Sequence, residues 1–565
     1  MTMKWWQKAV FYQVYPPAFA DGNGDGIGDL PGLIQKLDYL QDLGVDAIWL
    51  SPHYPSPMVD CGYDISDYCA VDPHYGTLDD FKDLVAEIHR RKMHLVLDLV
   101  LNHTSDQHEW FYEARSSREN PKHNWYVWQE GEPGTPPNNW FSTFGGSAWE
   151  WNPPTNEYYY HFFFKEQPDL NWRNPAVQQA MFEMIRFWLR LGVDGFRLDA
   201  VGTIFEDPAY PDQESGVDQD QFEQLEIQAA HSEDQSYYVK LWELGFKHQH
   251  DRPEVHELMK EIRKVVDEFE DRVLIGETDD IAFYGNGNDE IHLNFNFPLM
   301  RTNRLTARWI MDNQRERLAT LPEGAWPCNT LNNHDTGRVW SNLGDGKNDL
   351  ALAKLSLAVV LFLKGTPFLF NGEEIGMRNQ YSFELEDFRD PLSVRGYHLV
   401  RKWGGASHAE ALQYAAQRGR DKGRTPLQWS SNPNGGFCPE GVRPWLPVSK
   451  DYAEGVNVAG QRADPNSLWS FYQRMLHFRQ AHPELVLGEY QPLETDEKLL
   501  AYRRFTPQNS CLVLLNFSDQ TIHTMLRGWQ GSAEMIFNSD PDAKSVQSSS
   551  DVRVHPFEIW IGQEK

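Results

Sequence analysis

The stretch Gly195-Phe-Arg-Leu-Asp-Ala-Val201 decides the fold, because it carries an arginine and an aspartate inside an otherwise apolar run. Charged side chains are costly to bury and usually lie outside. Two further runs end in an acid in the same way, Val273-Leu-Ile-Gly-Glu277 and Leu331-Asn-Asn-His-Asp335. Continuous apolar runs are typical of strands buried on both faces of a parallel sheet. Acids at one end of such strands indicate a barrel enzyme, which builds its active site there.

Strands and amphipathic helices alternate around this stretch, which predicts an α/β fold of the TIM (β/α)8 barrel type. Two predicted helices are followed by a glycine, Gly44 and Gly192, which is a common helix stop. The apolar run 355–370 is interrupted by polar, glycine and proline residues and predicts a buried helix followed by a buried strand. We expect strands over residues 9–15, 46–50 and 94–98, and helices over 33–43, 81–91 and 177–191.

Three segments interrupt the alternation. Residues 104–174, rich in Trp, Pro, Asn and Gly, predict an excursion domain after strand three. The acidic stretch 205–239 is expected to form a long loop over the active end of the barrel, and the charged stretch 378–428 a lid rather than a core. Alternating runs over 486–565 predict a C-terminal antiparallel β-sandwich domain. The catalytic barrel is therefore expected to span residues 1–103 and 175–485.

Composition narrows the classes of function. The chain has 565 residues, too many for a single core. Its net charge of −30 argues against nucleic acid and anionic membrane surfaces as partners. The 21 Trp, 23 Tyr and 31 Phe suit sugar rings, although a large core would use them equally. Five scattered cysteines predict free thiols in a reducing cytoplasm, and the start shows no apolar leader segment. We expect a monomer or a homodimer.

Four motifs, each closing a predicted strand, resemble the signature regions of the α-amylase superfamily (glycoside hydrolase family thirteen). They are Asp98-Leu-Val-Leu-Asn-His103, Gly195-Phe-Arg-Leu-Asp199, Gly276-Glu277 and Asn333-His-Asp335. Any one motif is weak evidence, whereas the ordered set is specific. Further motifs are similar to those of the oligo-1,6-glucosidase/α-glucosidase branch: Val14-Tyr15-Pro16, Gly62-Tyr-Asp-Ile-Ser-Asp-Tyr68, Gln167-Pro-Asp-Leu-Asn171, Gly372-Glu-Glu-Ile-Gly-Met377 and Arg424-Thr-Pro-Leu-Gln-Trp429.

The resemblance implies a retaining, exo-acting α-glucosidase in which Asp199 is the nucleophile, Glu277 the acid/base and Asp335 a ligand of sugar hydroxyls. A retaining mechanism needs its two working carboxyls about 5–5.5 Å apart. Arg197 lies two residues before Asp199 on one strand, so it points to the same side and is expected to keep Asp199 ionised. Glu277 must start the cycle protonated. A lone acid at a strand end is more often a helix cap or an ion pair, but three in register are not.

The resemblance also implies a pocket for the terminal glucose, with no organic cofactor. Asp60 and Arg420 would pair behind that glucose and close the pocket, and Arg338 is expected to hold Asp335. Phe144 and Phe163 either shape the entrance or pack in the core. The expected substrate-binding residues are Asp60, Tyr63, His103, Phe144, Phe163, Gln167, Arg197, Ala200, His334, Arg338 and Arg420.

Ala200 departs from the branch pattern. A valine after the nucleophile usually accompanies α-1,6 preference in this branch, so alanine favours a broad or α-1,4-preferring enzyme. Cys61 and Thr336-Gly337 also replace more usual residues on the acceptor side. These departures leave the identity of the α-glucoside substrate open.

The first predicted loop, Asp21-Gly-Asn-Gly-Asp-Gly-Ile-Gly-Asp29, resembles half of an EF-hand loop without its glutamate at the twelfth position. Crowded acidic and amide oxygens repel one another without a cation, whereas the plain alternative is a polar, glycine-rich turn. The resemblance implies a structural Ca²⁺, or Mg²⁺ in its place. The expected ligands are Asp21, Asn23, Asp25, the Ile27 carbonyl and Asp29.

Other functions remain open for the same site. A trehalose synthase or a sucrose isomerase differs only in whether a sugar hydroxyl or water resolves the covalent intermediate. A phosphotrehalose hydrolase is disfavoured because no basic cluster for phosphate is evident. A non-catalytic binding relative is disfavoured because the chain keeps its catalytic carboxylates.

Overall fold

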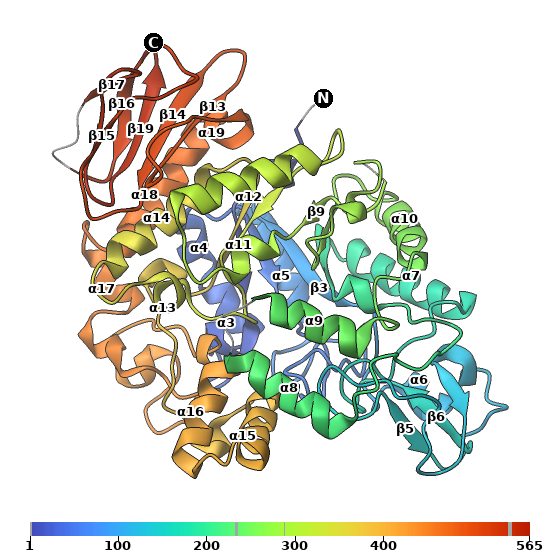
Figure 1. Cartoon of the computed structure of the whole chain (residues 1–565). Coiled ribbons are helices and arrows are strands. Elements are labelled where there is room, and N and C mark those ends of the chain that lie inside the picture. The colour runs from blue at the N-terminus through green and yellow to red at the C-terminus, as the bar shows by residue number, and fades with distance from the viewer. Residues whose placement is uncertain (1–2, 232–234, 288, 541–544) are drawn as a thin grey trace.

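An eight-stranded parallel sheet forms the centre of the computed structural model, which describes residues 3–231, 235–287, 289–540 and 545–565. The strand order β10-β11-β1-β2-β3-β7-β8-β9 closes the sheet into a nearly complete barrel (Figure 1), which confirms the predicted fold class. The strands are β1 (Phe11–Val14), β2 (Ala47–Leu50), β3 (His94–Val100), β7 (Gly195–Asp199), β8 (Val273–Gly276), β9 (Leu293–Asn294), β10 (Cys328–Asn329) and β11 (Thr366–Phe370).

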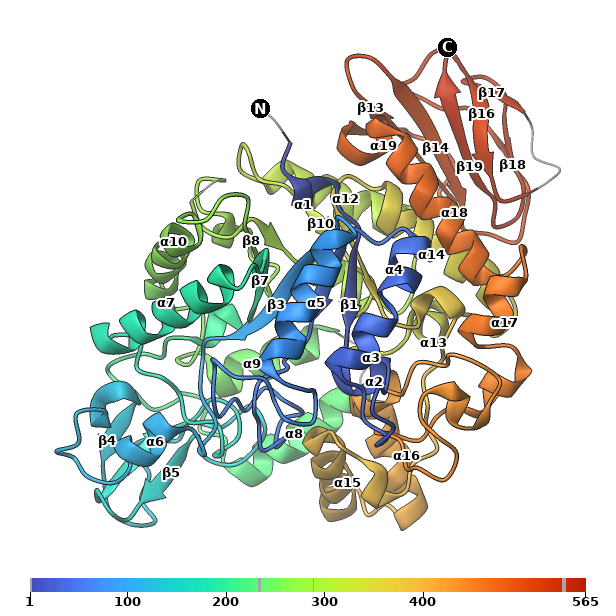
Figure 2. The ribbon, with the colours of Figure 1, turned by 180° about the vertical axis from the view of Figure 1, so that it is seen from behind.

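Helices cover the outside of the barrel (Figure 2). The predicted helix over 33–43 is two helices that meet at Lys36, whose backbone leaves the helical region at φ −105° and ψ 5°. Thr77 caps the next helix by accepting a hydrogen bond from the Asp80 amide. The barrel helices include α3 (Leu30–Gln35), α4 (Leu37–Leu43), α5 (Leu78–Arg90), α7 (Pro175–Arg190), α10 (Glu254–Val266), α12 (Ala307–Thr320), α14 (Asp349–Phe362) and α18 (Leu468–Ala481).

The register of three neighbouring strands brings the acidic residues together. On β3 and β7, Asp98 pairs with Arg197, and Val100 pairs with Asp199. On β7 and β8, Leu198 pairs with Gly276, the residue before Glu277. Because all strands are parallel, these residues lie at the same, carboxyl end of the barrel.

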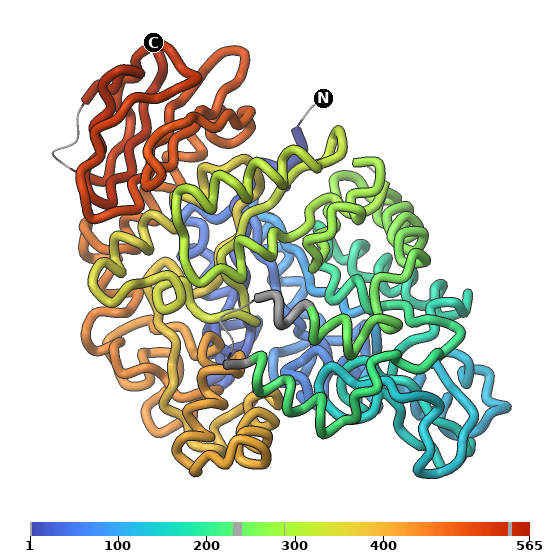
Figure 3. The backbone as a smooth tube through the Cα atoms, viewed as in Figure 1, coloured from blue at the N-terminus to red at the C-terminus, as the bar shows by residue number. Residues whose placement is uncertain are grey.

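The excursion and the C-terminal region lie at opposite ends of the molecule (Figure 3), and each contains antiparallel sheet. The excursion after β3 contains a three-stranded sheet of β4 (Trp128–Glu130), β6 (Glu157–Tyr160) and β5 (Trp149–Asn152). The C-terminal region contains a six-stranded sheet and a two-stranded one, as the sequence predicted for a β domain. The exact domain boundaries stay a prediction. The C-terminal strands are β12 (Glu489–Pro492), β13 (Leu499–Phe505), β14 (Ser510–Asn516), β15 (Ile522–Thr524), β16 (Ser532–Asn538), β17 (Val546–Ser548), β18 (Val552–Val554) and β19 (Ile559–Glu564).

The acidic segment 205–239 is not the predicted long loop. It contains α8 (Gln219–His231) and the start of α9 (Gln235–Phe246), and residues 232–234 lie outside the described part of the chain. Figure 1 shows both helices in front of the barrel. The α8 sequence is rich in Gln, Glu and Ala, which are good helix formers. Phe222 of α8 is buried and stacks on Phe141 of the excursion at 4.7 Å, a partner that local sequence does not reveal.

The segment 378–428 also differs from the prediction, because its helices take part in a buried apolar cluster together with Tyr15 and Phe370. Its helices α15 (Pro391–Trp403) and α16 (His408–Arg418) bury Tyr397, Val400 and Ala415 between them. Arg395 of α15 forms an ion pair with Glu226 of α8 at 2.5 Å, so the two insertions are joined. In the described part of the chain, no helix is long and apolar enough to span a membrane.

Candidate active site

One arginine lies at the centre of the carboxylates. The Arg197 side chain is fully buried, and its Nη1 donates to Asp98 Oδ1 at 2.7 Å and to Asp199 Oδ1 at 2.6 Å. Its Nη2 forms an ion pair with Glu277 Oε2 at 2.9 Å. The same oxygen accepts a hydrogen bond from the Ala200 amide at 2.9 Å. A single guanidinium therefore bridges Asp199 and Glu277 and places them as neighbours, as a retaining mechanism requires.

The charge balance of this cluster favours retention of a proton. Burial raises the pKa of Asp199 well above its usual range, although Arg197 opposes the rise. Burial likewise raises the pKa of Asp98 to about 6 against the pull of Arg197. The predicted Arg197–Asp199 pair is thus present, but one guanidinium does not offset three carboxylates, of which Asp98 is fully buried and the other two largely so. Such a cluster shares its protons and can supply one to a leaving group.

Asp335 lies in a second cluster with more positive charge. Arg424 Nη2 donates to Asp335 Oδ1 at 2.7 Å, and Arg420 Nη1 lies 3.4 Å from the same oxygen. Burial alone would raise the pKa of Asp335, but His334, Arg424 and Arg420 hold it well below its usual range. Asp335 is therefore an ionised acceptor for sugar hydroxyls over the whole neutral pH range.

The predicted Asp60–Arg420 pair is present, and its closure of a glucose pocket stays a prediction. Arg420 Nη2 donates to Asp60 Oδ1 at 2.8 Å. Gln167 Nε2 donates to the other Asp60 oxygen at 3.3 Å and lies 2.9 Å from His103 Nε2. The Phe144 ring lies 5.9 Å from the Arg420 guanidinium. Phe163 contacts His103 edge to face at 5.1 Å, so both phenylalanines line this side of the site.

A chain of hydrogen bonds joins the two clusters. Gln13 Nε2 donates to His334 Nδ1 at 2.7 Å. His334 Nε2 then carries the proton and donates to the Tyr63 hydroxyl at 2.6 Å, and Tyr63 donates to Asp98 Oδ2 at 3.1 Å. Burial lowers the pKa of His334 well below its usual range, so the ring stays neutral. His103 and His334 thus form hydrogen bonds to neighbouring protein groups, and their predicted contact with the sugar stays a prediction.

The expected contact between Arg338 and Asp335 is wrong. Arg338 donates to the backbone carbonyls of Asn371 and Thr425, and Arg424 holds Asp335 instead. Spacing along the sequence does not show whether Arg338 or Arg424 contacts Asp335. Tertiary packing decides which of the two arginines reaches the carboxylate.

Sequence reasoning did not assign a role in the site to three further residues: Asp98, Arg424 and Asp390. Asp98 is an acid inside a buried apolar run, within β3, so the same signal of a charge among apolar residues could have identified it. Arg424 belongs to the same basic stretch as Arg420. Asp390 precedes Pro391 and looks in sequence like an ordinary helix cap, so it has no comparable signal.

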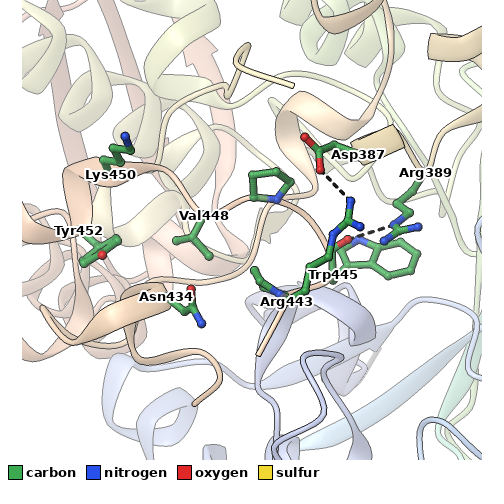
Figure 4. Close-up of a pocket in the computed structure, with 10 residues that line it drawn as sticks. Asp387, Arg389, Asn434, Arg443, Trp445, Val448, Lys450 and Tyr452 are labelled. Atoms are coloured by element: carbon green, nitrogen blue, oxygen red, sulfur yellow. Dashed lines mark hydrogen bonds and ion pairs between the residues drawn. The ribbon is translucent and has the colours of Figure 1, made fainter. Parts of the chain in front are cut away.

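A cavity of ≈ 330 Å³ is lined by residues between Asp387 and Tyr452 (Figure 4). Arg443 pairs there with Asp387 at 2.9 Å, and Arg389 Nε donates to the Trp445 carbonyl at 3.2 Å. Among the described residues, the lining of this cavity leaves out the clustered carboxylates. We therefore assign no chemistry to it.

In the loop of residues 21–29, side-chain oxygens accept hydrogen bonds from backbone amides of the loop itself. Asp29 is the tightest member, because its carboxylate accepts from the amides of Gly22, Asn23 and Gly32 and caps α3. Asp25 Oδ1 accepts one amide bond, from Ile27 at 2.8 Å, and is exposed. The other bonds join Asp21 to the amides of Gly24 and Gly26 at 2.6 and 2.8 Å, and Asn23 to that of Asp25 at 2.9 Å.

These contacts fit a hard divalent cation. Each oxygen of Asp21, Asn23 and Asp25 keeps a free lone pair, and oxygen donors of this kind suit Ca²⁺. In the part of the chain that the structure describes, no three His, Cys, Asp or Glu side chains converge as a metal site. A cation in this loop therefore depends on the Asn23 amide and the Ile27 carbonyl as well as on carboxylates.

Comparison with known proteins agrees with this geometry. The family model "Alpha amylase, catalytic domain" matches residues 13–488. An oligo-1,6-glucosidase of Parageobacillus thermoglucosidasius is 38% identical, with 99% of each chain covered. A probable alpha-glucosidase of Rhizobium meliloti is 41% identical over 91% of this chain and 90% of that protein. The crystal structure of the trehalulose synthase MutB from Pseudomonas mesoacidophila has a TM-score of 0.87, is 37% identical and covers 100% of both chains. The chain therefore belongs to the α-amylase family of glycoside hydrolases.

Proposed function

We propose that the protein is a retaining, exo-acting α-glucosidase that hydrolyses terminal α-linked glucose from short oligosaccharides or other α-glucosides. One observation carries this proposal: a buried guanidinium bridges Asp199 and Glu277, and Arg420 pairs with Asp60 in the same group of charged residues. We take this pair as the closed end of the glucose pocket. The pairing of two carboxyls supplies the chemistry of glycoside cleavage. The closed end admits a single terminal sugar and so removes one unit at a time.

The first step forms a covalent intermediate. An oxygen of Asp199 attacks the anomeric carbon while the bond to the glycosidic oxygen breaks. Glu277 gives its proton to that oxygen, and the aglycone leaves as an alcohol. The retaining mechanism requires Asp199 to react as the anion and Glu277 as the acid. The Arg197 guanidinium, which contacts Asp199 at 2.6 Å, stabilises the negative charge that Asp199 must carry.

The second step releases glucose. Glu277, now a carboxylate, takes a proton from water, whose oxygen attacks the anomeric carbon. The bond to Asp199 breaks, Asp199 leaves as a carboxylate, and Glu277 is protonated again for the next cycle. Asp335 accepts hydrogen bonds from the glucose hydroxyls throughout and stays ionised because Arg424 and Arg420 contact it.

An isomerase or transglycosylase is the second candidate, because a trehalulose synthase is 37% identical over the whole chain. In that case the hydroxyl of a retained sugar, rather than water, attacks the intermediate. The two candidates share every residue of the first step, so only the acceptor decides between them.

The test is product analysis with separate substrates. The purified protein is incubated with maltose, isomaltose, sucrose and trehalose, and all sugars are resolved by chromatography, with Asp199→Ala as the control. Free glucose as the main product, absent with the variant, supports the hydrolase. A rearranged disaccharide at constant total sugar supports the isomerase. Absence of turnover for all four sugars contradicts both.

We also propose a structural Ca²⁺, or Mg²⁺ in its place, in the loop of residues 21–29. Asp21, Asn23, Asp25 and the Ile27 carbonyl would hold it, with Asp29 as the most heavily bonded member. Bound there, the cation would tie the first βα loop together and take no part in the reaction. The five cysteines, all free in the structure, support a reducing cytoplasm as the place of action of a monomer or homodimer.

A further inference from the structure

The arginine that closes the glucose pocket is held by a second buried aspartate. We propose that Asp390 is a positioning residue that fixes Arg420 against Asp60 and thereby sets the affinity of the pocket for the terminal glucose. This inference rests on the proposed function and adds to it a residue that touches Arg420 and not the sugar.

Asp390 binds Arg420 at both ends. Its Oδ1 accepts from Arg420 Nη2 at 2.8 Å, and its Oδ2 accepts from the Arg420 backbone amide at 2.7 Å. The Asp390 carboxylate thus binds both the backbone amide and the guanidinium of Arg420, and the two bonds together restrict the conformation of the Arg420 side chain. The Asp390 side chain is 0% exposed, so water does not compete for these bonds.

Asp390 is itself rigidly placed. Its backbone amide donates to Asp421 Oδ2 at 2.9 Å, and the preceding amide of Arg389 donates to the same oxygen at 2.8 Å. Its Oδ1 also accepts from the Leu392 amide at 3.1 Å and so caps α15. The start of a helix that packs in a buried apolar cluster therefore anchors the carboxylate.

One nitrogen of Arg420, Nη2, donates to both Asp60 and Asp390. Asp390 therefore helps to set the position of the guanidinium relative to Asp60. Nη2 donates to Asp60 and to Asp390, each at 2.8 Å, while Nη1 lies 3.4 Å from Asp335. If the Asp390 charge were removed, Asp60 at 2.8 Å and Asp335 at 3.4 Å would be left to share the guanidinium. Arg420 would then no longer be held in one position against Asp60.

The effect should appear in binding rather than in chemistry. Arg420 and Asp60 act at the end of the glucose remote from the bond that breaks, so their contacts are equally strong in the ground state and the transition state. Loss of such uniform binding raises KM and leaves kcat nearly unchanged. A residue that merely stabilises the fold has no reason to produce this split.

Asp390→Asn is the sharpest variant, because asparagine is as good a helix cap as aspartate but carries no charge. We expect the inhibition constant of free glucose, and KM for p-nitrophenyl α-glucoside, to rise about ten- to hundredfold, as for loss of a hydrogen bond to a charged group. We expect kcat to stay within about threefold. Asp387→Asn is the matched control, because Asp387 lies on the same segment but pairs with Arg443 outside the carboxylate clusters (Figure 4).

A double-mutant cycle with Arg420→Lys tests the proposed route. If Asp390 acts through Arg420, Asp390→Asn changes the glucose constant little in the Arg420→Lys background. Additive effects, an unchanged glucose constant, or a fall in kcat with constant KM would each overturn the inference. If Asp390→Asn does not fold, Asp390→Ser, which retains a helix cap, carries the same measurements. A wild type that binds glucose but cleaves no α-glucoside refutes the proposed function, and glucose binding by calorimetry then still tests Asp390.

Discussion

The two carboxylate clusters of the pocket contrast in their charge balance. In the first, Asp98, Asp199 and Glu277 share one guanidinium, that of Arg197. In the second, Asp335 contacts two arginines, Arg424 and Arg420, and Arg420 is also shared with Asp60 and Asp390. The pKa of Asp199 lies well above its usual range because burial outweighs Arg197, whereas that of Asp335 lies well below it.

The difference shows that burial alone does not set the state of a buried acid. Burial raises the pKa of both aspartates, yet the local number of guanidinium groups reverses the direction of the net shift at Asp335. The proton-rich cluster suits acid/base chemistry, and the ionised one suits hydroxyl binding. One pocket thereby holds carboxylates with two different tasks.

Arg197→Lys should break the first cluster and gives the largest expected effect. Lysine keeps the charge but cannot bridge three carboxylates, so Asp199 and Glu277 lose their common anchor. We expect kcat/KM to fall on the order of 10²- to 10³-fold, since breaking a buried ion pair costs about 3–5 kcal/mol. Steady-state kinetics with p-nitrophenyl α-glucoside measures it, and circular dichroism checks the fold. Activity within threefold of wild type would refute the bridging role.

Arg424→Gln should make the second cluster resemble the first. Without this guanidinium the pKa of Asp335 should rise, so the acid limb of the kcat/KM profile should move to higher pH, with a loss of about tenfold at neutral pH. Because the native pKa of Asp335 is depressed, its carboxylate contributes stability above about pH 4 that is lost as the pH falls through that native pKa. The variant should therefore lose less stability on acidification. An unmoved acid limb would contradict this account.

Ala200→Val tests the residue that follows Asp199 and whose amide donates to Glu277, on the side of the site where the acceptor is expected to bind. The added methyl groups should narrow the acceptor side and raise kcat/KM for isomaltose relative to maltose by about three- to tenfold. Ala200 has φ 43° and ψ 45°, a left-handed conformation that disfavours β-branched residues by about 1–2 kcal/mol. A lower melting temperature should therefore accompany the shift. An unchanged ratio for the two sugars would sink the specificity role.

Removal of the proposed cation should have the smallest effect, because its loop lies outside both clusters. A chelator should lower the melting temperature by about 2 °C and leave kcat at 25 °C unchanged. Asp25→Asn should abolish the response, since Asp25 is exposed and not a helix cap. Calorimetry with and without added Ca²⁺ measures it. Equal melting temperatures for the wild type in both conditions would refute a structural cation.

The sequence by itself determined the barrel and its three catalytic candidates. An acid that ends a continuous apolar run is energetically unusual, so Asp199, Glu277 and Asp335 stood out without any structure. Parallel strands then required their carboxyl ends to meet. The Asp60–Arg420 pair followed from the family resemblance rather than from any local pattern.

Only the tertiary structure decided which cations serve which acids. Arg424 and not Arg338 reaches Asp335, and Asp390 reaches Arg420 across 30 positions of sequence. The helices of segment 205–239 likewise depend on a partner, because Phe222 is buried against the excursion domain. The physical reason is common to all three: ion pairs and buried aromatic contacts are set by distances in the folded chain, and spacing along the sequence does not encode those distances.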